Sequence, residues 1–170
     1  MTLRGMLATV GPWIALVIAT PSPASAQDVI FVVRHAEKEV SPPTDPPLST
    51  EGKRRAEALR DTLKGAGVKA IITSPFSRTK ETGKPLATAL GIAPLIDPMD
   101  DAKALIDKIR GLPGGGNVLV VGHSHTIPQL LKALGHSPPV TISETEFDNL
   151  FVVTPGEVTR PRVIRLRYRS

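Results

Sequence analysis

The stretch that decides the fold is Val29-Ile30-Phe31-Val32-Val33-Arg34-His35-Ala36-Glu37-Lys38. Its first five residues, 29–33, are apolar and mostly β-branched, which is typical of a strand buried on both faces of a parallel sheet. The run ends abruptly in Arg34 and His35. Because open α/β folds bind ligands at the carboxyl ends of their strands, these two side chains are predicted to line a site there. The alternative is a strand that turns polar where it meets solvent.

Strand and helix patterns alternate through the rest of the chain. Further strands are predicted at 70–73, 95–96, 117–121, 149–154 and 163–168. Helices are predicted from Ser49 or Thr50 to about 65, from Ser74 to near 91, over 102–112 and over 127–134. The alternation predicts an α/β fold, a three-layer sandwich with a mainly parallel sheet and helices on both faces. The last two strands are predicted to form an antiparallel edge hairpin through Pro155-Gly156.

The second predicted helix carries two proline signals. Ser74-Pro75 predicts an N-cap serine with proline at the first helical position, which puts Arg78 in or just after the first turn. Pro85 predicts a break in the same helix.

The first 26 residues stand apart from this pattern. Arg4 precedes a mostly apolar run, and Ala24-Ser25-Ala26 is a small-residue cleavage site, so residues 1–26 are predicted to be a signal peptide. Residues 27–170 are then a single domain of ordinary size. The protein is expected to be exported, periplasmic or secreted, with no transmembrane anchor after cleavage. The alternative is an uncleaved anchor.

The amino-acid composition excludes several kinds of site and ligand. The chain has no cysteine, which excludes disulfides, a thiol nucleophile and thiolate metal sites. Loss of Arg4 lowers the formal net charge from +5 to +4, which suits anionic small molecules but is too mild to indicate nucleic-acid binding. Aromatic residues make up 4% of the chain, so base-stacking surfaces are not expected.

Cationic and imidazole side chains follow three of the predicted strands. Arg34 and His35 follow the first, Arg78 the second and His123 the strand at 117–121. Because carboxyl ends of parallel strands share one edge, the four side chains are expected to converge. Two arginines and two histidines suit a tetrahedral dianion, since the guanidinium fork matches phosphate oxygens. A neutral imidazole there can attack phosphorus and form a phosphohistidine.

At this point the chain resembles the histidine phosphatase superfamily, the group with the phosphoglycerate mutase-like fold, and in particular its small branch that acts on phosphohistidine or small phosphoesters. The motifs that carry the resemblance are Arg34-His35-Ala36-Glu37, Leu48-Ser49-Thr50-Glu51-Gly52, Thr73-Ser74-Pro75-Phe76-Ser77-Arg78-Thr79-Lys80-Glu81-Thr82 and Val121-Gly122-His123-Ser124. The resemblance implies that His35 is the nucleophile. It also implies that Arg34, Arg78 and His123 hold the phosphoryl group, with Ser124 beside them, and that no metal or other cofactor takes part.

The chain departs from the family pattern at two places. Ser41 stands where members often carry an asparagine six residues beyond the nucleophile, and it is retained as a weaker substrate-binding donor. Larger members also supply a carboxylic acid that protonates the leaving oxygen. The best local candidate is Asp97, with Asp100 and Asp101 behind it, but the alternative for this acidic patch is the first turn of a helix, whose dipole favours carboxylates.

Other interpretations compete with this one. Gly122-His123-Ser124-His125-Thr126 imitates the serine nucleophile elbow of α/β-hydrolases, although His136 is the only later histidine. His123 and His125 have a spacing that permits zinc, but a third ligand is lacking. His125 is more simply a rim residue or helix cap, and His136 a surface residue.

Two further hypotheses concern binding. A protein with the same anion pocket could bind phosphorylated ligands of the cell envelope without turnover. Arg165, Arg167 and Arg169 alternate with apolar residues, which indicates an edge strand with one cationic face. That face is either solvated and protected from aggregation by its charge, or it docks on an anionic envelope surface. The preferred partner is a small phosphorylated substrate, phosphate groups of envelope glycolipid included.

Overall fold

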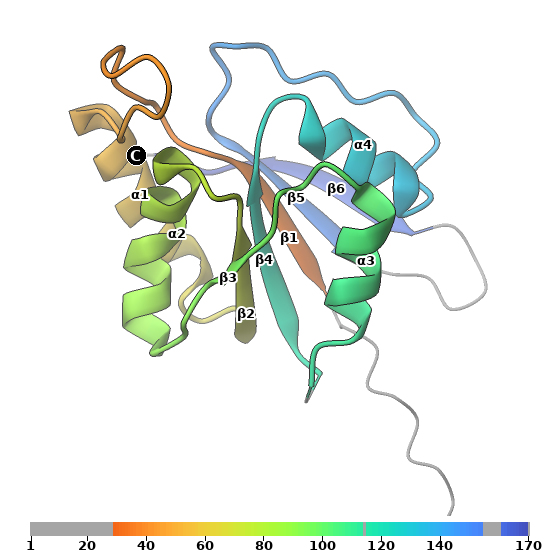
Figure 1. The fold of residues 1–170 in the computed structure, drawn as a ribbon. Coiled ribbons are helices and arrows are strands. Elements are labelled where there is room, and N and C mark those ends of the chain that lie inside the picture. The colour runs from red at the N-terminus through yellow and green to blue at the C-terminus, as the bar shows by residue number, and fades with distance from the viewer. Residues whose placement is uncertain (1–28, 114, 155–160, 170) are drawn as a thin grey trace, which may run out of the picture.

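The structure, a computed structural model, describes residues 29–113, 115–154 and 161–169. Figure 1 shows its helices and strands in the order of the chain. Their bounds are β1 Ile30–Arg34, α1 Thr50–Leu63, β2 Val68–Thr73, α2 Ser77–Leu90, β3 Leu95–Ile96, α3 Ala102–Arg110, β4 Asn117–Gly122, α4 Thr126–Ala133, β5 Asn149–Thr154 and β6 Arg162–Arg167.

All six strands lie in one sheet, in the order β3-β2-β4-β1-β5-β6. The neighbouring pairs among β1 to β4 are parallel, whereas β5 is antiparallel to both β1 and β6. The predicted fold class is therefore confirmed, with a mostly parallel sheet and an antiparallel edge pair.

Helices cover both faces of this sheet, as Figure 1 shows. Phe31 and Val33 of β1 belong to the core under α1 and α2, while Ile30 and Val32 belong to the core under α3 and α4. Successive side chains of a strand point to opposite faces, so a strand between two helical layers needs an unbroken apolar run. That requirement explains the composition of the first strand.

The second helix differs from its prediction at both proline signals. It begins at Ser77, and its N-cap is Phe76 rather than Ser74. The Ser74 hydroxyl instead lies 2.8 Å from Thr79 Oγ1 and 3.0 Å from His123 Nε2. The helix also continues through Pro85, because Leu86 and Ala87 directly after it are buried in the core, where packing outweighs the lost backbone hydrogen bond.

Two sequence predictions fall on residues that the structure does not describe. The predicted signal peptide, 1–26, and the turn through Pro155-Gly156 both lie outside the described ranges, so the signal peptide and the proposed domain boundaries stay predictions. Within the ranges that are described, no helix has the length and apolarity needed to cross a bilayer.

The first helix begins against the backbone that follows His35. Glu37 O accepts a hydrogen bond from Ser49 N at 2.9 Å, and Ser49 Oγ accepts one from Gly52 N at 3.1 Å, which caps the helix. A Cβ atom at Gly52 would lie 2.0 Å from Glu37 O. Glycine is therefore required here by close approach of two backbones.

We predict that Gly52→Ala destabilises the protein by about 1–3 kcal/mol, the usual cost of overpacking, although alanine is the better helix former. Thermal unfolding measures the change. Gly65→Ala is the matched control, since a Cβ there would meet nothing within 4 Å. Equal melting temperatures for the two variants would contradict the close approach.

Candidate active site

Two neighbouring strands deliver the buried polar groups of the site. Arg34 at the end of β1 pairs in register with Gly122 at the end of β4, and His35 N donates to Gly122 O at 2.9 Å. The His35 and His123 rings lie 5.4 Å apart between centroids. Arg34, His35 and His123 are each 5% exposed or less. Three of the four side chains predicted to converge therefore lie together at the carboxyl edge of the sheet, and Arg78 is linked to them through Phe76, whose ring contacts both Arg78 and His123.

The His35 imidazole has one nitrogen committed and one available. Nδ1 donates to Ala36 O at 2.8 Å, which assigns the proton to Nδ1 and leaves Nε2 with its lone pair. Thr82 of α2 accepts from Ala36 N at 2.9 Å and so fixes this turn from the other side. Burial, with the nearby charges of Arg34 and Arg78, lowers the pKa of His35 to about 4. At neutral pH the ring is an uncharged potential nucleophile.

His123 is held by its own turn. Its backbone N donates to Thr126 Oγ1 at 2.9 Å, and its Nε2 lies 3.0 Å from Ser74 Oγ. A Cβ at Gly122 would come within 2.9 Å of Thr126 Oγ1, so the glycine permits this tight turn. Burial and the neighbouring His35 and Arg78 lower the pKa of His123 to about 3.

These two lowered pKa values predict a pH-dependent stability. Unfolding returns the imidazoles to the ordinary pKa of 6.5, so below that pH the unfolded chain binds protons that the native chain does not. Stability is then lost as the pH falls from 6.5 toward about 4 for His35 and about 3 for His123.

Urea unfolding at about pH 7 and about pH 5 measures this effect, in a window where paired carboxylates still keep their charge. We expect a lower midpoint at pH 5 and a smaller difference in His123→Gln. A midpoint independent of pH would contradict the account.

The two pocket arginines share a pattern of contacts. The Arg34 guanidinium lies 4.3 Å from the centre of the Phe147 ring, and that of Arg78 lies 4.2 Å from the Phe76 ring. Both Nε atoms are buried and have no hydrogen-bond partner among the described residues. A buried donor without an acceptor is costly, and such uncompensated groups are more common at functional sites than elsewhere.

The loop between α4 and β5 supplies residues that sequence reasoning missed. Arg34 Nη1 donates to Ser143 O at 2.7 Å and to Glu146 O at 3.3 Å, while Nη2 binds Glu144 Oε2 at 2.6 Å. Two of these contacts are made by backbone carbonyls, which any residue supplies. The segment also has no strand or helix periodicity, so no sequence signal pointed to it.

Ser124 lies at the rim and contacts the same loop. Its hydroxyl donates to Glu144 Oε1 at 2.8 Å. A serine nucleophile needs an imidazole base at that position. The contact therefore favours a binding or rim position for Ser124 over the nucleophile elbow.

Ser41, the predicted weaker substrate-binding donor, lies in the proline-rich loop between β1 and α1. Ser41 is exposed, and the same loop brings Asp45 close to Arg78. Asp45 accepts hydrogen bonds from Ser77 N and Ser77 Oγ, both at 2.8 Å, and its carboxylate lies 3.9 Å from Arg78 Nη1.

The acidic residues at 97–101 were the candidates for a general acid, and two of them contact groups of α3 and its preceding loop. Asp97 forms an ion pair with Lys108 and accepts a hydrogen bond from Met99 N at 2.9 Å. Asp101 is the N-cap of α3 and accepts from Lys103 N at 2.8 Å. Asp100 is exposed. The structure thus favours the helix-terminus interpretation of this patch over a general acid.

The basic edge strand is largely neutralised within the chain. Arg165 binds Glu146 at 3.2 Å and Asn149 at 2.7 Å, and Arg167 binds Glu146 and Asp148, both at 2.5 Å. Arg169 is exposed. The paired charges favour the solvated edge over a docking surface.

The remaining histidines lie outside the buried cluster. His125 is the N-cap residue of α4 and is exposed, and its ring stacks on His123 at 5.5 Å. His136 is half-buried near the end of α4. Across the described ranges no three His, Cys, Asp or Glu side chains are grouped as metal ligands.

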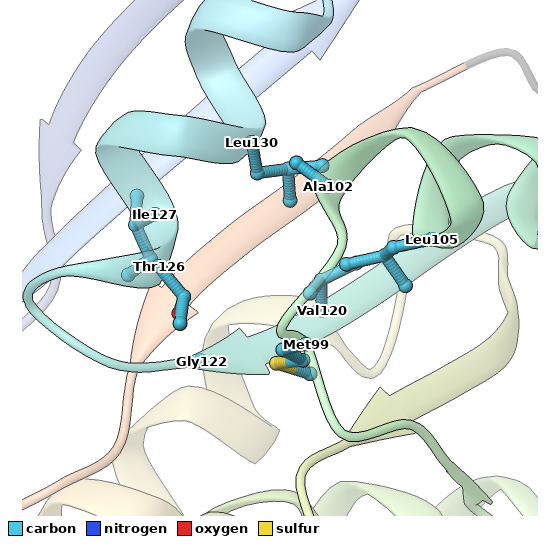
Figure 2. Close-up of a pocket in the computed structure, with 8 residues that line it drawn as sticks. All are labelled: Met99, Ala102, Leu105, Val120, Gly122, Thr126, Ile127 and Leu130. Atoms are coloured by element: carbon cyan, nitrogen blue, oxygen red, sulfur yellow. The ribbon is translucent and has the colours of Figure 1, made fainter.

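A small hollow beside the site is unsuited to an anionic ligand. It lies between α3, α4 and the end of β4, with Met99, Leu105 and Ile127 in its lining (Figure 2). It is mainly apolar and has room for about one water molecule. The charged cluster, not this hollow, is the candidate active site.

Part of this chain is similar in sequence to proteins of a known family. The model of the histidine phosphatase superfamily (branch 1) matches residues 30–101. A probable phosphoglycerate mutase, GpmB, from Yersinia enterocolitica is 33% identical over 75 residues, which is 41% of this chain and 35% of that protein. The chain thus spans about a third of the length of the curated relatives that it matches.

Solved structures share the fold over most of the chain. The protein histidine phosphatase SixA, complexed with tungstate, superposes with a TM-score of 0.64 at 21% identity and covers 82% of this chain and 96% of its own. A mycobacterial glucosyl-3-phosphoglycerate phosphatase complexed with VO3 gives 0.67 at 15% identity, over 84% of this chain and 100% of its own. At these identities the likeness concerns the fold.

Proposed function

We propose that this chain is a phosphatase that acts through a phosphohistidine intermediate on His35, because residues 30–101 match the model of the histidine phosphatase superfamily (branch 1). Its substrates in this proposal are phosphomonoesters or phosphoramidates. Arg34, Arg78 and His123 hold the phosphoryl group, and the chemistry uses these side chains in place of a metal.

One observation carries the proposal. His35 is a buried, uncharged imidazole with a free Nε2, and it lies close enough to Arg34 and Arg78 for both charges to act on it. Two guanidinium charges near this ring balance a phosphoryl dianion.

The reaction follows from these positions. His35 Nε2 attacks phosphorus, the bond from phosphorus to the leaving group breaks, and its electron pair departs with the leaving group. The Nδ1–H bond to Ala36 O keeps the phosphorylated ring oriented. Arg34 and Arg78 stabilise charge on the phosphoryl oxygens, which is where catalysis of phosphoryl transfer mainly acts. Water then releases phosphate and restores His35.

The substrate is proposed to be a small phosphorylated molecule. The engaged state of Asp97 and Asp101 favours good leaving groups, such as a phosphorylated imidazole, over unactivated alkyl phosphates. We further propose that the protein is exported, on the signal-peptide pattern of residues 1–26. Export favours envelope compounds, glycolipid phosphate among them, over cytoplasmic phosphorelay proteins.

Turnover separates this proposal from non-catalytic binding of the same ligands. Purified protein is incubated with 4-nitrophenyl phosphate in the presence of a chelator, and phosphate release is followed. The proposal predicts catalytic hydrolysis at many turnovers per molecule. Tight phosphate binding without hydrolysis would instead support an anion-binding protein of the envelope.

A further inference from the structure

One loop places a carboxylate on the buried arginine next to the nucleophile. Glu144 Oε2 lies 2.6 Å from Arg34 Nη2, and Glu144 Oε1 accepts from Ser124 Oγ at 2.8 Å. The Arg34 side chain is 4% exposed and that of Glu144 is 80% exposed. The carboxylate therefore lies on the solvent side of the buried Arg34 guanidinium and is itself open to water.

The remaining donors of Arg34 fix where a phosphoryl group sits relative to Glu144. Both protons of Nη1 point to loop carbonyls, and one proton of Nη2 goes to Glu144. Nη2 has a second proton that can donate to a phosphoryl oxygen. A phosphoryl oxygen on that proton and Glu144 Oε2 are then acceptors on the same nitrogen, about 5 Å apart. One water molecule fits between them.

Other carboxylates near the strand ends are less well placed. Asp97 is paired with Lys108, and Asp101 caps α3. Asp45 is held by Ser77 at the start of α2 and lies 3.9 Å from Arg78, whereas Glu144 contacts the arginine that directly precedes His35. Glu144 is held by Arg34, the residue directly before the proposed nucleophile, and keeps most of its surface open to water.

We propose that Glu144 is the general base that activates water in the hydrolysis of the phosphohistidine. This inference rests on the proposed function. Water oxygen bonds to phosphorus as Glu144 takes one of its protons. The bond between His35 Nε2 and phosphorus breaks, and its electron pair returns to Nε2. The ring keeps its Nδ1 proton and leaves neutral, phosphate departs, and Glu144 releases its proton to solvent.

The state of the carboxylate matches this role. The Ser124 hydrogen bond and the Arg34 charge hold the pKa of Glu144 below its usual range. Glu144 is therefore ionised at neutral pH, and it does not donate a proton in the first step. The substrates that result are those whose leaving group departs without protonation by Glu144, such as phosphorylated imidazoles and aryl phosphates.

Rapid-quench kinetics with 4-nitrophenyl phosphate test the proposal, because they time formation and decay of the phosphoenzyme separately. In Glu144→Gln we expect decay to slow on the order of 10²-fold and formation to stay within a few fold of wild type. Nitrophenolate then appears in a burst that matches the enzyme concentration. Both kcat and KM fall, and kcat/KM is retained.

Asp148→Asn is the matched control, since it removes an equal charge from the same loop at a carboxylate that faces Arg167. Its phosphoenzyme should decay at the wild-type rate. Equal slowing of formation and decay in Glu144→Gln would overturn the proposal and make Glu144 a positioning residue for Arg34. Unchanged decay would also overturn it. Wild-type turnover with no phosphoenzyme on His35 would remove the proposed function itself.

Discussion

Replacement of His35 with alanine is expected to lower turnover by at least about 10³-fold, because the variant lacks the group that attacks phosphorus. The remaining arginines still bind phosphate but have no nucleophile to transfer it to. Initial rates of 4-nitrophenyl phosphate hydrolysis measure the loss. Phosphate affinity, measured by calorimetry, should persist within an order of magnitude, since Arg34, Arg78 and His123 stay in place.

His125→Ala is the matched control for this result, because it removes an exposed imidazole one ring away from the buried pair. We expect its turnover to stay within a few fold of wild type. An equally large loss in both variants would contradict the assignment of His35 and reopen the zinc and serine interpretations.

Arg78→Ala is expected to lower turnover on the order of 10²–10³-fold, the usual effect of removing one donor that stabilises transition-state charge. The Arg78 guanidinium is one of the two positive charges that act on His35, and it is proposed to hold the phosphoryl group. The side chain lies outside the apolar core clusters, so the fold should be retained.

Arg78→Lys should recover only part of this activity, because an ammonium keeps the charge but not the two-pronged donor geometry. Arg110→Ala is the control for general loss of positive charge, since this side chain is 73% exposed on α3. Near-normal turnover in Arg78→Ala, with thermal stability unchanged, would contradict the proposed pocket.

Much of the sheet and of the candidate site can be predicted from the sequence, because the patterns that indicate them are local. The apolar run through Val33 and the matching run that ends at Gly122 predict buried parallel strands, and both are present. The polar residues that follow each strand then converge because parallel strands end on one edge. Arg34, His35, Arg78 and His123 were all predicted in this way.

The rest depended on contacts between distant segments. Glu144 reaches Arg34 from 110 positions along the chain, and nothing in its neighbours distinguishes it from a solvated surface residue. Asp45 lies in a proline-rich loop whose path is set by Ser77 rather than by its own sequence. Ser74 resembles an N-cap residue in the sequence, but its hydroxyl lies within hydrogen-bonding distance of His123 and Thr79 and does not cap the helix. Local rules fail here because tertiary contacts supply alternative partners.

The most direct test of the central claim is to find the phosphorylated residue. Protein mixed with 4-nitrophenyl phosphate in chelator is quenched, digested under conditions that preserve phosphohistidine and analysed by mass spectrometry. The account predicts an acid-labile phosphoryl group on His35 and none in His35→Ala. Hydrolysis by wild type with no adduct on His35, or with an adduct on another residue, would contradict it.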